Sequence, residues 1–244
     1  MHSSKELNPA SARFGAHIIA MQVPEQLEEE VYRHLLSDAA PDKQQRIERY
    51  VRRADAYRSL LADAIVRRRL ATQLRLKTSA LTFSSNAYGK PYVEQGEGLH
   101  FNTTHSGQWV AVVFSDEPSG IDVEIMKKSD SLPLARRFFS PTEYEAIQAS
   151  DQQLQTFYTY WSMKESYIKA LGLGLSKELT SFTVLIGADG SADVEDEGRL
   201  SSYRIYPFEL DKDYSSTVCL KAGCRIGAVE VWGLAALMEA SNPV

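Results

Sequence analysis

The chain has 244 residues, of which 43% are hydrophobic, and its formal net charge at pH 7 is −5. This length suits one large domain or two small ones, and the negative balance argues against a general nucleic-acid binder. Two cysteines, Cys219 and Cys224, are too few for a disulfide framework, and no apolar run is long enough to span a bilayer. Residues 1–13 are polar and lack the apolar centre of a signal peptide, so we expect a loose leader, a cytoplasmic location and no membrane partner.

The first half of the chain is expected to form a strand, then helices, then short strands. Residues 14–21 are predicted as a strand, and residues 24–37 have the apolar spacing of an amphipathic helix. A second helical region should start near Pro41, a residue that suits a first helical turn, and should reach about Leu76 with a break. Short strands separated by glycine-containing turns are predicted at residues 81–84, 99–103 and 109–115.

A boundary between two halves is predicted at residues 117–120, where proline, serine and glycine interrupt the pattern. A strand should follow at residues 120–124. Ser140, Pro141 and Glu143 form a capping-box pattern, which predicts the start of a helix. The expected units are the leader at residues 1–13, an N-terminal unit at residues 14–118 and a C-terminal unit at residues 119–244.

The helix that carries residues 161–169 should end at Gly172, because glycine is a frequent residue just past a helix C-terminus. Strands are predicted after it at residues 181–186, 203–208, 215–220 and 228–233. Strands and helices are thus mixed without a regular βαβ alternation. This order indicates an α+β fold.

The most informative spacing in the chain joins an indole, a carboxylate and an ammonium. Trp161, Glu165 and Lys169 are four and four residues apart, so on a helix they lie on one face. Upstream, Asp122 and Glu124 point to the same side if their segment is a strand, because side chains alternate. Together, the carboxylates and the lysine favour a magnesium site that also holds phosphate.

These two motifs, in this order, resemble the signature of the 4′-phosphopantetheinyl transferases of the Sfp (surfactin-synthetase-activating) type. The resemblance runs from about residue 41 to about residue 184. Further segments that match the family in order are residues 88–91, 101–107, 136–140 and 174–176. The resemblance implies a monomer of two similar subdomains in a pseudo-twofold arrangement, with the active site in the cleft between them.

The resemblance assigns the carboxylates of Asp122, Glu124 and Glu165 to Mg²⁺. Asp122, Glu165 and Lys169 are implied to be catalytic, and Lys169 is implied to contact the pyrophosphate of coenzyme A. From the residues alone, Lys169 could also be a surface lysine that pairs with Glu165 at i,i+4. Glu165 is the preferred acceptor for the proton of the attacking hydroxyl, either directly or through a metal-bound water, and these two routes stay open.

The nucleotide end of coenzyme A is implied to lie on the first half. Thr104 and His105 correspond to a Ser-His pair of the family at the 3′-phosphate, and the threonine keeps the hydroxyl. Lys43, Arg46 and Ser59 align with other positions that meet the 3′-phosphate. Solvated helix faces explain the two basic residues equally well.

The loop at Gly89, Lys90 and Pro91 is implied to place its backbone at the adenine and its lysine at a phosphate. A plain turn is the alternative for this loop. Trp161 is expected to pack rather than to act in catalysis, by wedging its helix against a sheet.

The implied reaction is the Mg²⁺-dependent transfer of 4′-phosphopantetheine from coenzyme A to a serine of apo carrier proteins, with release of 3′,5′-ADP. The carriers would be peptidyl or acyl carrier domains of non-ribosomal peptide, polyketide or fatty acid synthases. Residues 125–140 mix basic and apolar side chains and are expected to dock this acidic partner.

Two other functions account for part of these residues. A Mg²⁺-dependent phosphohydrolase would use the same carboxylates, but it leaves Lys90, Thr104 and His105 without a purpose. A non-catalytic module that binds coenzyme A or a carrier protein would be favoured if a metal carboxylate were missing, and the sequence has all of them.

Overall fold

The computed structural model describes residues 15–128 and 131–240, so the predicted leader lies outside the described part. The strands are β1 (Ala16–Gln22), β2 (Phe83–Ser85), β3 (Pro91–Val93), β4 (His100–Ser106), β5 (Trp109–Ser115), β6 (Gly120–Ile125), β7 (Phe182–Ile186), β8 (Ala192–Asp196), β9 (Arg199–Pro207), β10 (Tyr214–Lys221) and β11 (Ile226–Trp232). The helices are α1 (Glu29–Ser37), α2 (Pro41–Glu48), α3 (Arg53–Leu74), α4 (Ser131–Phe138), α5 (Pro141–Ala149), α6 (Gln153–Leu171) and α7 (Leu234–Glu239). Within the described ranges, none of these helices has both the length and the apolar content that a bilayer crossing needs.

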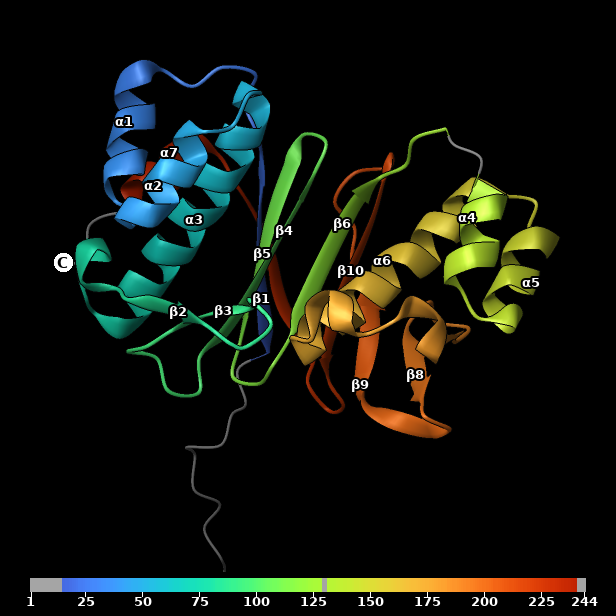
Figure 1. Ribbon diagram of the computed structural model, residues 1–244. Coiled ribbons are helices and arrows are strands. Elements are labelled where there is room, and N and C mark those ends of the chain that lie inside the picture. Colours follow the sequence, from blue (N-terminus) through green and yellow to red (C-terminus); the bar gives the residue numbers. More distant parts are fainter. Residues whose placement is uncertain (1–14, 129–130, 241–244) are drawn as a thin grey trace, which may run out of the picture.

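The two halves of the molecule are built alike. In each half a first strand is followed by helices and then by strands, the last of which pairs antiparallel with the first: β5 with β1, and β10 with β6. The long helix α3 packs on the four-stranded sheet (β11-β1-β5-β4) and α6 on the five-stranded sheet (β6-β10-β9-β8-β7), so the layers run helix, sheet, sheet, helix (Figure 1). This arrangement confirms the predicted α+β fold.

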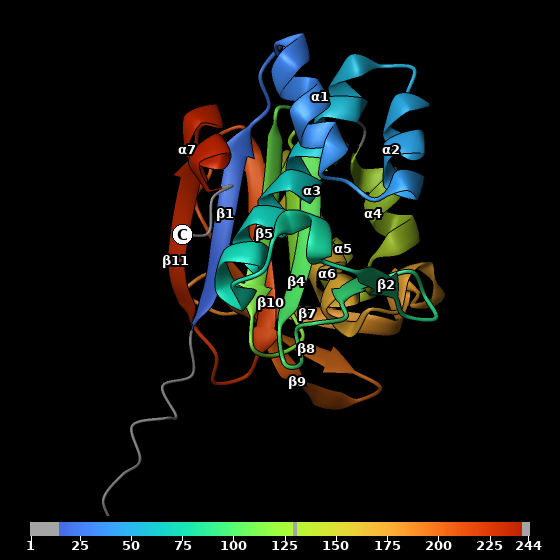
Figure 2. The ribbon, with the colours of Figure 1, turned by 90° about the vertical axis from the view of Figure 1, so that its left-hand side faces the viewer.

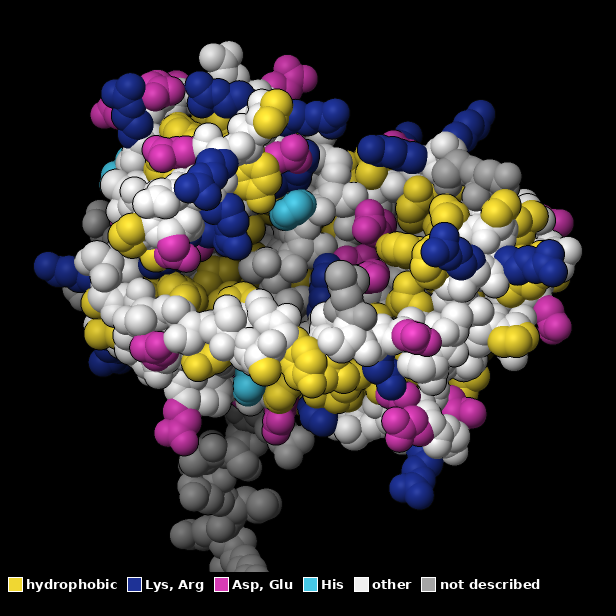
Figure 3. Space-filling model, viewed as in Figure 1, with side chains coloured by type: hydrophobic (Ala, Val, Ile, Leu, Met, Phe, Trp, Pro, Cys, Tyr) yellow, Lys and Arg dark blue, Asp and Glu magenta, His cyan; other side chains and the backbone are white. Residues whose placement is uncertain are grey.

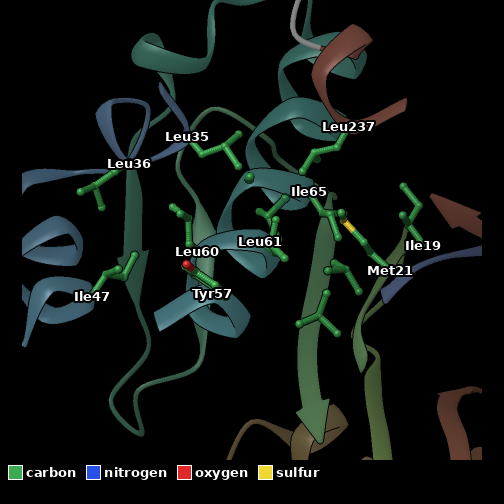
Figure 4. Close-up of a cluster of buried hydrophobic side chains, with 14 of the residues drawn as sticks. Ile19, Met21, Leu35, Leu36, Ile47, Tyr57, Leu60, Leu61, Ile65 and Leu237 are labelled. Carbon is green, nitrogen blue, oxygen red and sulfur yellow. The ribbon is translucent and has the colours of Figure 1, made fainter. Parts of the chain in front are cut away.

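Strand alternation divides the hydrophobic side chains between the layers. Ile19 and Met21 of β1 point toward α3, where they pack with Leu61 and other buried side chains (Figure 4). Ile18 and Ala20 of the same strand point the other way, into the core between the two sheets. Because a strand buried on both faces loses apolar surface to both layers, β1 reads in the sequence as a nearly continuous apolar run.

The end of the chain returns to the first half. β11 pairs parallel with β1, and Leu237 of α7 is fully buried in the core formed with α1 and α3 (Figure 2). The predicted C-terminal unit at residues 119–244 is therefore wrong at its end. The physical reason is the free edge of β1, which β11 covers and removes as a site for unwanted pairing.

The two sheets meet where their edge strands β4 and β6 run side by side. Alternate side chains of β4 there accept hydrogen bonds from alternate backbone N–H groups of β6. The bonds run from Ile121 N to Asn102 Oδ1 (2.9 Å), from Val123 N to Thr104 Oγ1 (3.3 Å) and from Ile125 N to Ser106 Oγ (3.1 Å). We call this row of side chains, Asn102, Thr104 and Ser106, the polar seam. It satisfies the edge of β6 and fixes one half against the other.

Helix α6 packs directly on β6 because Gly120 has no side chain. A Cβ at this position would lie 2.1 Å from the carbonyl oxygen of Ser166, so any other residue would push the helix away. The close approach sets the face of α6 that carries Glu165 and Lys169 over the acidic strand β6.

Candidate active site

Asp122 lies at the centre of the site, on β6 beneath α6. Its side chain is buried, and Lys169 Nζ donates to its Oδ1 at 2.6 Å. The same ammonium lies 3.2 Å from the carbonyl oxygen of Ile121 and 3.3 Å from Thr104 Oγ1. Asp122 Oδ2, in contrast, is buried and has no hydrogen-bond partner among the residues that the structure describes. A carboxylate oxygen in that position is poorly solvated and calls for a cation or a donor.

Glu124 and Glu165 both feel the negative charge of Asp122. Ser106 Oγ donates to Glu124 Oε2 at 2.9 Å. Burial, followed by the negative charge of Asp122, raises the pKa of Glu124 to about 6. The same two causes, in the same order, raise the pKa of Glu165, while Lys169 acts in the opposite direction. The site is thus a concentration of negative charge that the ammonium of Lys169 balances only in part.

The chemistry of these donors suits a divalent cation. All are oxygen atoms, as Mg²⁺ prefers, and the unpartnered Asp122 Oδ2 is one ligand position. In the described ranges, however, no three His, Cys, Asp or Glu side chains come close enough together to hold a metal ion. Like-charged carboxylates repel one another without a cation, and Lys169 already holds Asp122 Oδ1. Ligation by Asp122, Glu124 and Glu165 stays a prediction.

Thr104 and His105 are neighbours on β4 and therefore face opposite ways. The hydroxyl of Thr104 donates to Asp122 Oδ1 at 3.3 Å and accepts from Val123 N and Lys169 Nζ, which uses its full hydrogen-bonding capacity. Strand alternation turns Thr104 into the polar seam. Its contact with a 3′-phosphate stays a prediction. His105 is exposed on the other face, and desolvation and then the charge of Arg58 lower its pKa.

The predicted phosphate ligands of helix α2 line a cavity on the first half. Lys43 and Arg46 surround a space of about 230 Å³ together with Pro91 and Arg67. Burial lowers the pKa of Lys43, because little water reaches its ammonium. Ser59 is buried in α3, one turn before the residues of that helix that line the cavity.

Arg67 completes this basic cavity and was not predicted as a site residue. It pairs with Asp63 at 2.7 Å. The run of three arginines at residues 67–69 was visible in the sequence, but nothing there indicated which of them faces the cavity. In the space-filling view, Lys and Arg side chains lie on the α1–α3 side of a hollow and acidic side chains on the other (Figure 3).

The loop between β2 and β3 holds the end of α6 rather than presenting a free lysine. Lys90 Nζ donates to the carbonyl oxygens of Ser119 (2.9 Å) and Ala170 (3.1 Å), and burial lowers its pKa to about 8. Asn86 Nδ2 donates to the carbonyl oxygen of Gly172 at 2.9 Å. In this structure the side chain of Lys90 reaches inward to these two carbonyl oxygens. Its contact with a phosphate stays a prediction.

The backbone of this loop makes a tight turn, as the sequence indicated. Gly89 has a φ of +87°, which favours glycine, and Asn86 Oδ1 accepts from the backbone N–H groups of Tyr88 and Lys90. Pro91 follows and begins β3, at the wall of the basic cavity. Contact of this backbone with an adenine stays a prediction.

Known families match both halves of the chain. Residues 118–219 match the 4′-phosphopantetheinyl transferase superfamily, and residues 26–117 match the N-terminal domain of 4′-phosphopantetheinyl transferases. The 4′-phosphopantetheinyl transferase Sfp of Bacillus subtilis (strain 168) is 41% identical over 195 residues, 79% of this chain and 87% of the relative. The chain belongs to the 4′-phosphopantetheinyl transferase family. It is of the Sfp type, as its motifs predicted.

A second relative matches the transferase over a similar share of both chains. The 4′-phosphopantetheinyl transferase gsp of Aneurinibacillus migulanus is 34% identical over 204 residues, 83% of this chain and 84% of the relative. One solved structure, the holo-[acyl-carrier-protein] synthase (AcpS) of Thermotoga maritima, matches in part, with a TM-score of 0.36 and 17% identity over 42% of this chain and 61% of that one.

The motif on α6 of the transferase also contains a structural lysine that the sequence did not reveal. Lys164 is fully buried, and its Nζ lies 2.8 Å from Glu143 Oε2, 2.8 Å from the carbonyl oxygen of Leu179 and 2.7 Å from that of Phe182. It fixes α6 against α5 and β7. The Lys164-Glu165 pair thus joins a structural side chain to a candidate catalytic one.

Trp161 packs, as predicted, but against a different neighbour. Its ring contacts those of Phe138, Phe139 and Phe157, with centroid distances of 6.1, 6.1 and 5.8 Å. These rings connect α6 to the end of α4 rather than to a sheet. Trp161 therefore anchors the surface helix α4 to the helix that carries Glu165 and Lys169.

Proposed function

We propose that the transferase moves 4′-phosphopantetheine from coenzyme A to a serine of an apo carrier protein, in a reaction that requires Mg²⁺. The observation that carries this proposal is the buried Asp122. One of its oxygens is held by Lys169, and the other has no partner in the described part of the chain. Membership of the transferase family supports the reaction type.

The reaction exchanges one P–O bond for another. The serine oxygen of the carrier forms a bond to the phosphorus that bears the pantetheine arm, and the bond from that phosphorus to 3′,5′-ADP breaks. The electron pair of the broken bond leaves with 3′,5′-ADP, and the serine proton passes to a base. Bound Mg²⁺, held by Asp122, Glu124 and Glu165, would neutralise the pyrophosphate and stabilise the leaving group.

The residues of the chain supply charge and a proton acceptor at this point. Lys169 places an ammonium at 2.6 Å from Asp122, where it can also balance a pyrophosphate. Burial raises the pKa of Glu165, which makes its carboxylate a better proton acceptor than an ordinary glutamate. The proton of the serine hydroxyl can pass to Glu165 directly or through a water. The overall reaction is the same by either route.

The nucleotide end of coenzyme A would bind on the first half. The cavity of Lys43, Arg46 and Arg67 offers cations to a phosphate, and the exposed His105 lies beside Arg58. The wall formed by Pro91 and the backbone of Gly89 would receive the adenine. We also infer that the transferase acts as a monomer, because both halves of the site come from one chain, and we keep the cytoplasmic location as part of the proposal.

Binding of coenzyme A should weaken as pH rises, through His105. In the free protein desolvation and Arg58 lower the pKa of this histidine, so it is mostly neutral near pH 7. A bound 3′-phosphate stabilises the protonated ring and raises that pKa, so the added affinity is present at low pH and is lost as pH rises through the pKa of the complex. The measurement is calorimetric Kd for coenzyme A between pH 5.5 and 8.5.

Two controls separate the pH effect of the histidine from that of the ligand. The phosphate itself gains negative charge over the same range, so each curve is compared with that of His105→Gln, and the difference is the contribution of the ring. Repeating the titration with 3′-dephospho-coenzyme A should abolish the difference. Identical pH profiles for wild type and His105→Gln would remove His105 from the phosphate site.

The carrier would dock on the surface that follows β6. Lys127 and Lys128 are exposed there, and Leu134 of α4 is 41% exposed. Lys127→Glu combined with Lys128→Glu should raise the KM for an acidic carrier by about tenfold, or ~1.4 kcal/mol, and leave the KM for coenzyme A unchanged. Steady-state kinetics with each substrate varied in turn measures both constants.

The matched control reverses two exposed charges elsewhere. Arg75→Glu with Lys77→Glu changes the net charge by the same amount just after α3. It should leave the KM for the carrier within about twofold. An equal rise in the KM for coenzyme A and for the carrier in the first variant would place docking on another surface.

The deciding experiment for the function is a mass measurement. The protein is incubated with coenzyme A, Mg²⁺ and an apo peptidyl carrier protein, and the carrier is then weighed. One added phosphopantetheine, absent when EDTA is included, is the expected result. Unchanged mass across peptidyl and acyl carriers refutes the proposal, and release of 3′,5′-ADP without a modified carrier favours the phosphohydrolase.

A further inference from the structure

A buried threonine on the neighbouring strand faces the same site. In the pairing of β10 with β6, Thr217 stands directly opposite Asp122. Side chains of directly paired residues lie on the same face of a sheet with their Cβ atoms about 4.5–5.5 Å apart. Both residues are almost fully buried, at 1% and 2% exposed. Thr217 therefore belongs to the face of the sheet that α6 covers.

Two oxygens on this face share an unusual condition. Thr217 Oγ1 and Asp122 Oδ2 are buried, and neither has a hydrogen-bond partner in residues 15–128 or 131–240. A buried hydroxyl without a partner is destabilising, and buried polar groups are rarely left so. One hydroxyl donor and one carboxylate oxygen on directly paired residues, both without a partner in the described part of the chain, indicate a shared third group.

The neighbouring Ser216 shows why the position matters. Its Oγ is also buried without a partner in the described ranges. Ser216, however, stands opposite Val123, whose side chain lies in the apolar core between the sheets. The two hydroxyls thus have similar burial and face opposite sides of one strand. Of the two, Thr217 is the residue paired directly with an aspartate.

We propose that Thr217 is a positioning residue of the divalent-cation site, and that its hydroxyl donates a hydrogen bond to a water that the ion retains beside Asp122 Oδ2. This inference rests on the proposed function. Mg²⁺ usually keeps several waters when protein carboxylates bind it. Partners in the outer shell orient these ligands, and their loss typically lowers metal affinity by 10–100-fold. Thr217 acts through water and does not touch the reacting atoms.

The test measures ion binding rather than turnover. Mn²⁺ binding to the full chain, with coenzyme A and without a carrier, is followed by electron paramagnetic resonance for wild type, Thr217→Val and Thr217→Ser. Valine keeps the shape and removes the hydroxyl, and we expect it to raise the Kd for Mn²⁺ by about tenfold or more. Serine restores the donor, and its Kd should stay within about threefold of wild type.

Stability provides a second readout with the opposite sign. In EDTA, Thr217→Val should melt at or above the temperature of wild type, because it removes a buried hydroxyl that has no partner in the described ranges. Saturating Mn²⁺ with coenzyme A should raise the melting temperature of Thr217→Val less than that of wild type. A simple packing defect would instead lower the melting temperature in EDTA.

Ser216→Ala is the matched control, and its Kd for Mn²⁺ should be unchanged. Equal Kd values for wild type and Thr217→Val overturn the inference, as does an equal weakening by Ser216→Ala. If the carrier is never modified but Thr217→Val still weakens Mn²⁺ binding, the proposed function fails and the role of Thr217 stands. A wild-type protein that binds neither Mn²⁺ nor Mg²⁺ with coenzyme A overturns both.

Discussion

Asp122→Asn should lower kcat for carrier modification by about 100-fold or more. The change keeps the shape of the side chain but removes the charge that holds Lys169 at 2.6 Å and the oxygen best placed for a cation. Stabilisation of phosphate charge by a metal ion is worth several kcal/mol, and about 3 kcal/mol corresponds to a factor of ~100 in rate. Single-turnover kinetics with a saturating carrier measures the loss directly.

The effect should appear in ion binding as well as in rate. The Kd for Mn²⁺ should rise in the asparagine variant, and excess Mg²⁺ should rescue kcat only poorly. Asp193→Asn is the matched control, because Asp193 is an exposed strand aspartate on β8 whose carboxylate lies 3.9 Å from Arg204. It should leave both quantities unchanged. Near-normal kcat in Asp122→Asn would contradict the metal assignment.

Lys164→Met should lower the free energy of unfolding by about 3–5 kcal/mol, the usual cost of removing one partner of a buried ion pair. Lys164 and Glu143 are 0% and 1% exposed. The ammonium has three protons and three acceptors, and its loss would leave a buried carboxylate and two carbonyl groups without that donor. Urea unfolding followed by tryptophan fluorescence measures the change.

Glu143 explains why replacing Lys164 alone should cost so much stability. Its carboxylate also accepts from Ser140 N at 2.8 Å and from Val184 N at 2.7 Å, so it joins the start of α5 to β7. Adding Glu143→Gln to Lys164→Met removes the uncompensated charge and should recover part of the lost stability. The control is Arg33→Met, which breaks an exposed i,i+4 pair and should cost about 0.5 kcal/mol or less. A loss below ~1 kcal/mol in Lys164→Met would contradict the buried pair.

Local signals in the sequence were sufficient for many elements of the fold. The capping box at Ser140 is confirmed in both of its hydrogen bonds, and α6 ends at Leu171 with Gly172 as its C-cap at a φ of +71°, as expected. The apolar run predicted at residues 109–115 is β5 with the same bounds. These features depend on residues within one helical turn or one strand, which a sequence shows directly.

Features that depend on distant partners were missed. Nothing in the sequence near Ile226 indicates that β11 pairs with β1 from the other end of the chain. The strand β8 at Ala192–Asp196 was not predicted, because acidic residues alternate with small and apolar ones in a segment that gains its partners only from β7 and β9. Tertiary pairing decides such segments more than their own propensity.

In the candidate site, too, features set by local motifs were predicted and features set by tertiary contacts were not. Asp122 and Lys169 were assigned from spacing and resemblance, and the structure brings them into contact. The hydrogen-bond partners that Thr104 and Lys90 have within the protein could not be predicted from their motifs. A motif gives the residue type. The direction of the side chain, set by strand alternation and by nearby hydrogen-bond acceptors, decides whether it faces a ligand or the rest of the protein. Thr217 carries no motif, and only the register of β10 against β6 brings it to the site.

The pairing of β11 with β1 also limits how far the protein can fold while it is being synthesised on the ribosome. The four-stranded sheet cannot be completed until residues 226–232 have been synthesised and have left the exit tunnel. Until then β1 has an open edge, and the core beneath α3 lacks Leu237. The first half therefore cannot complete its own sheet or core. Contacts of such long sequence separation slow folding, and the edge of β1 stays open until they form.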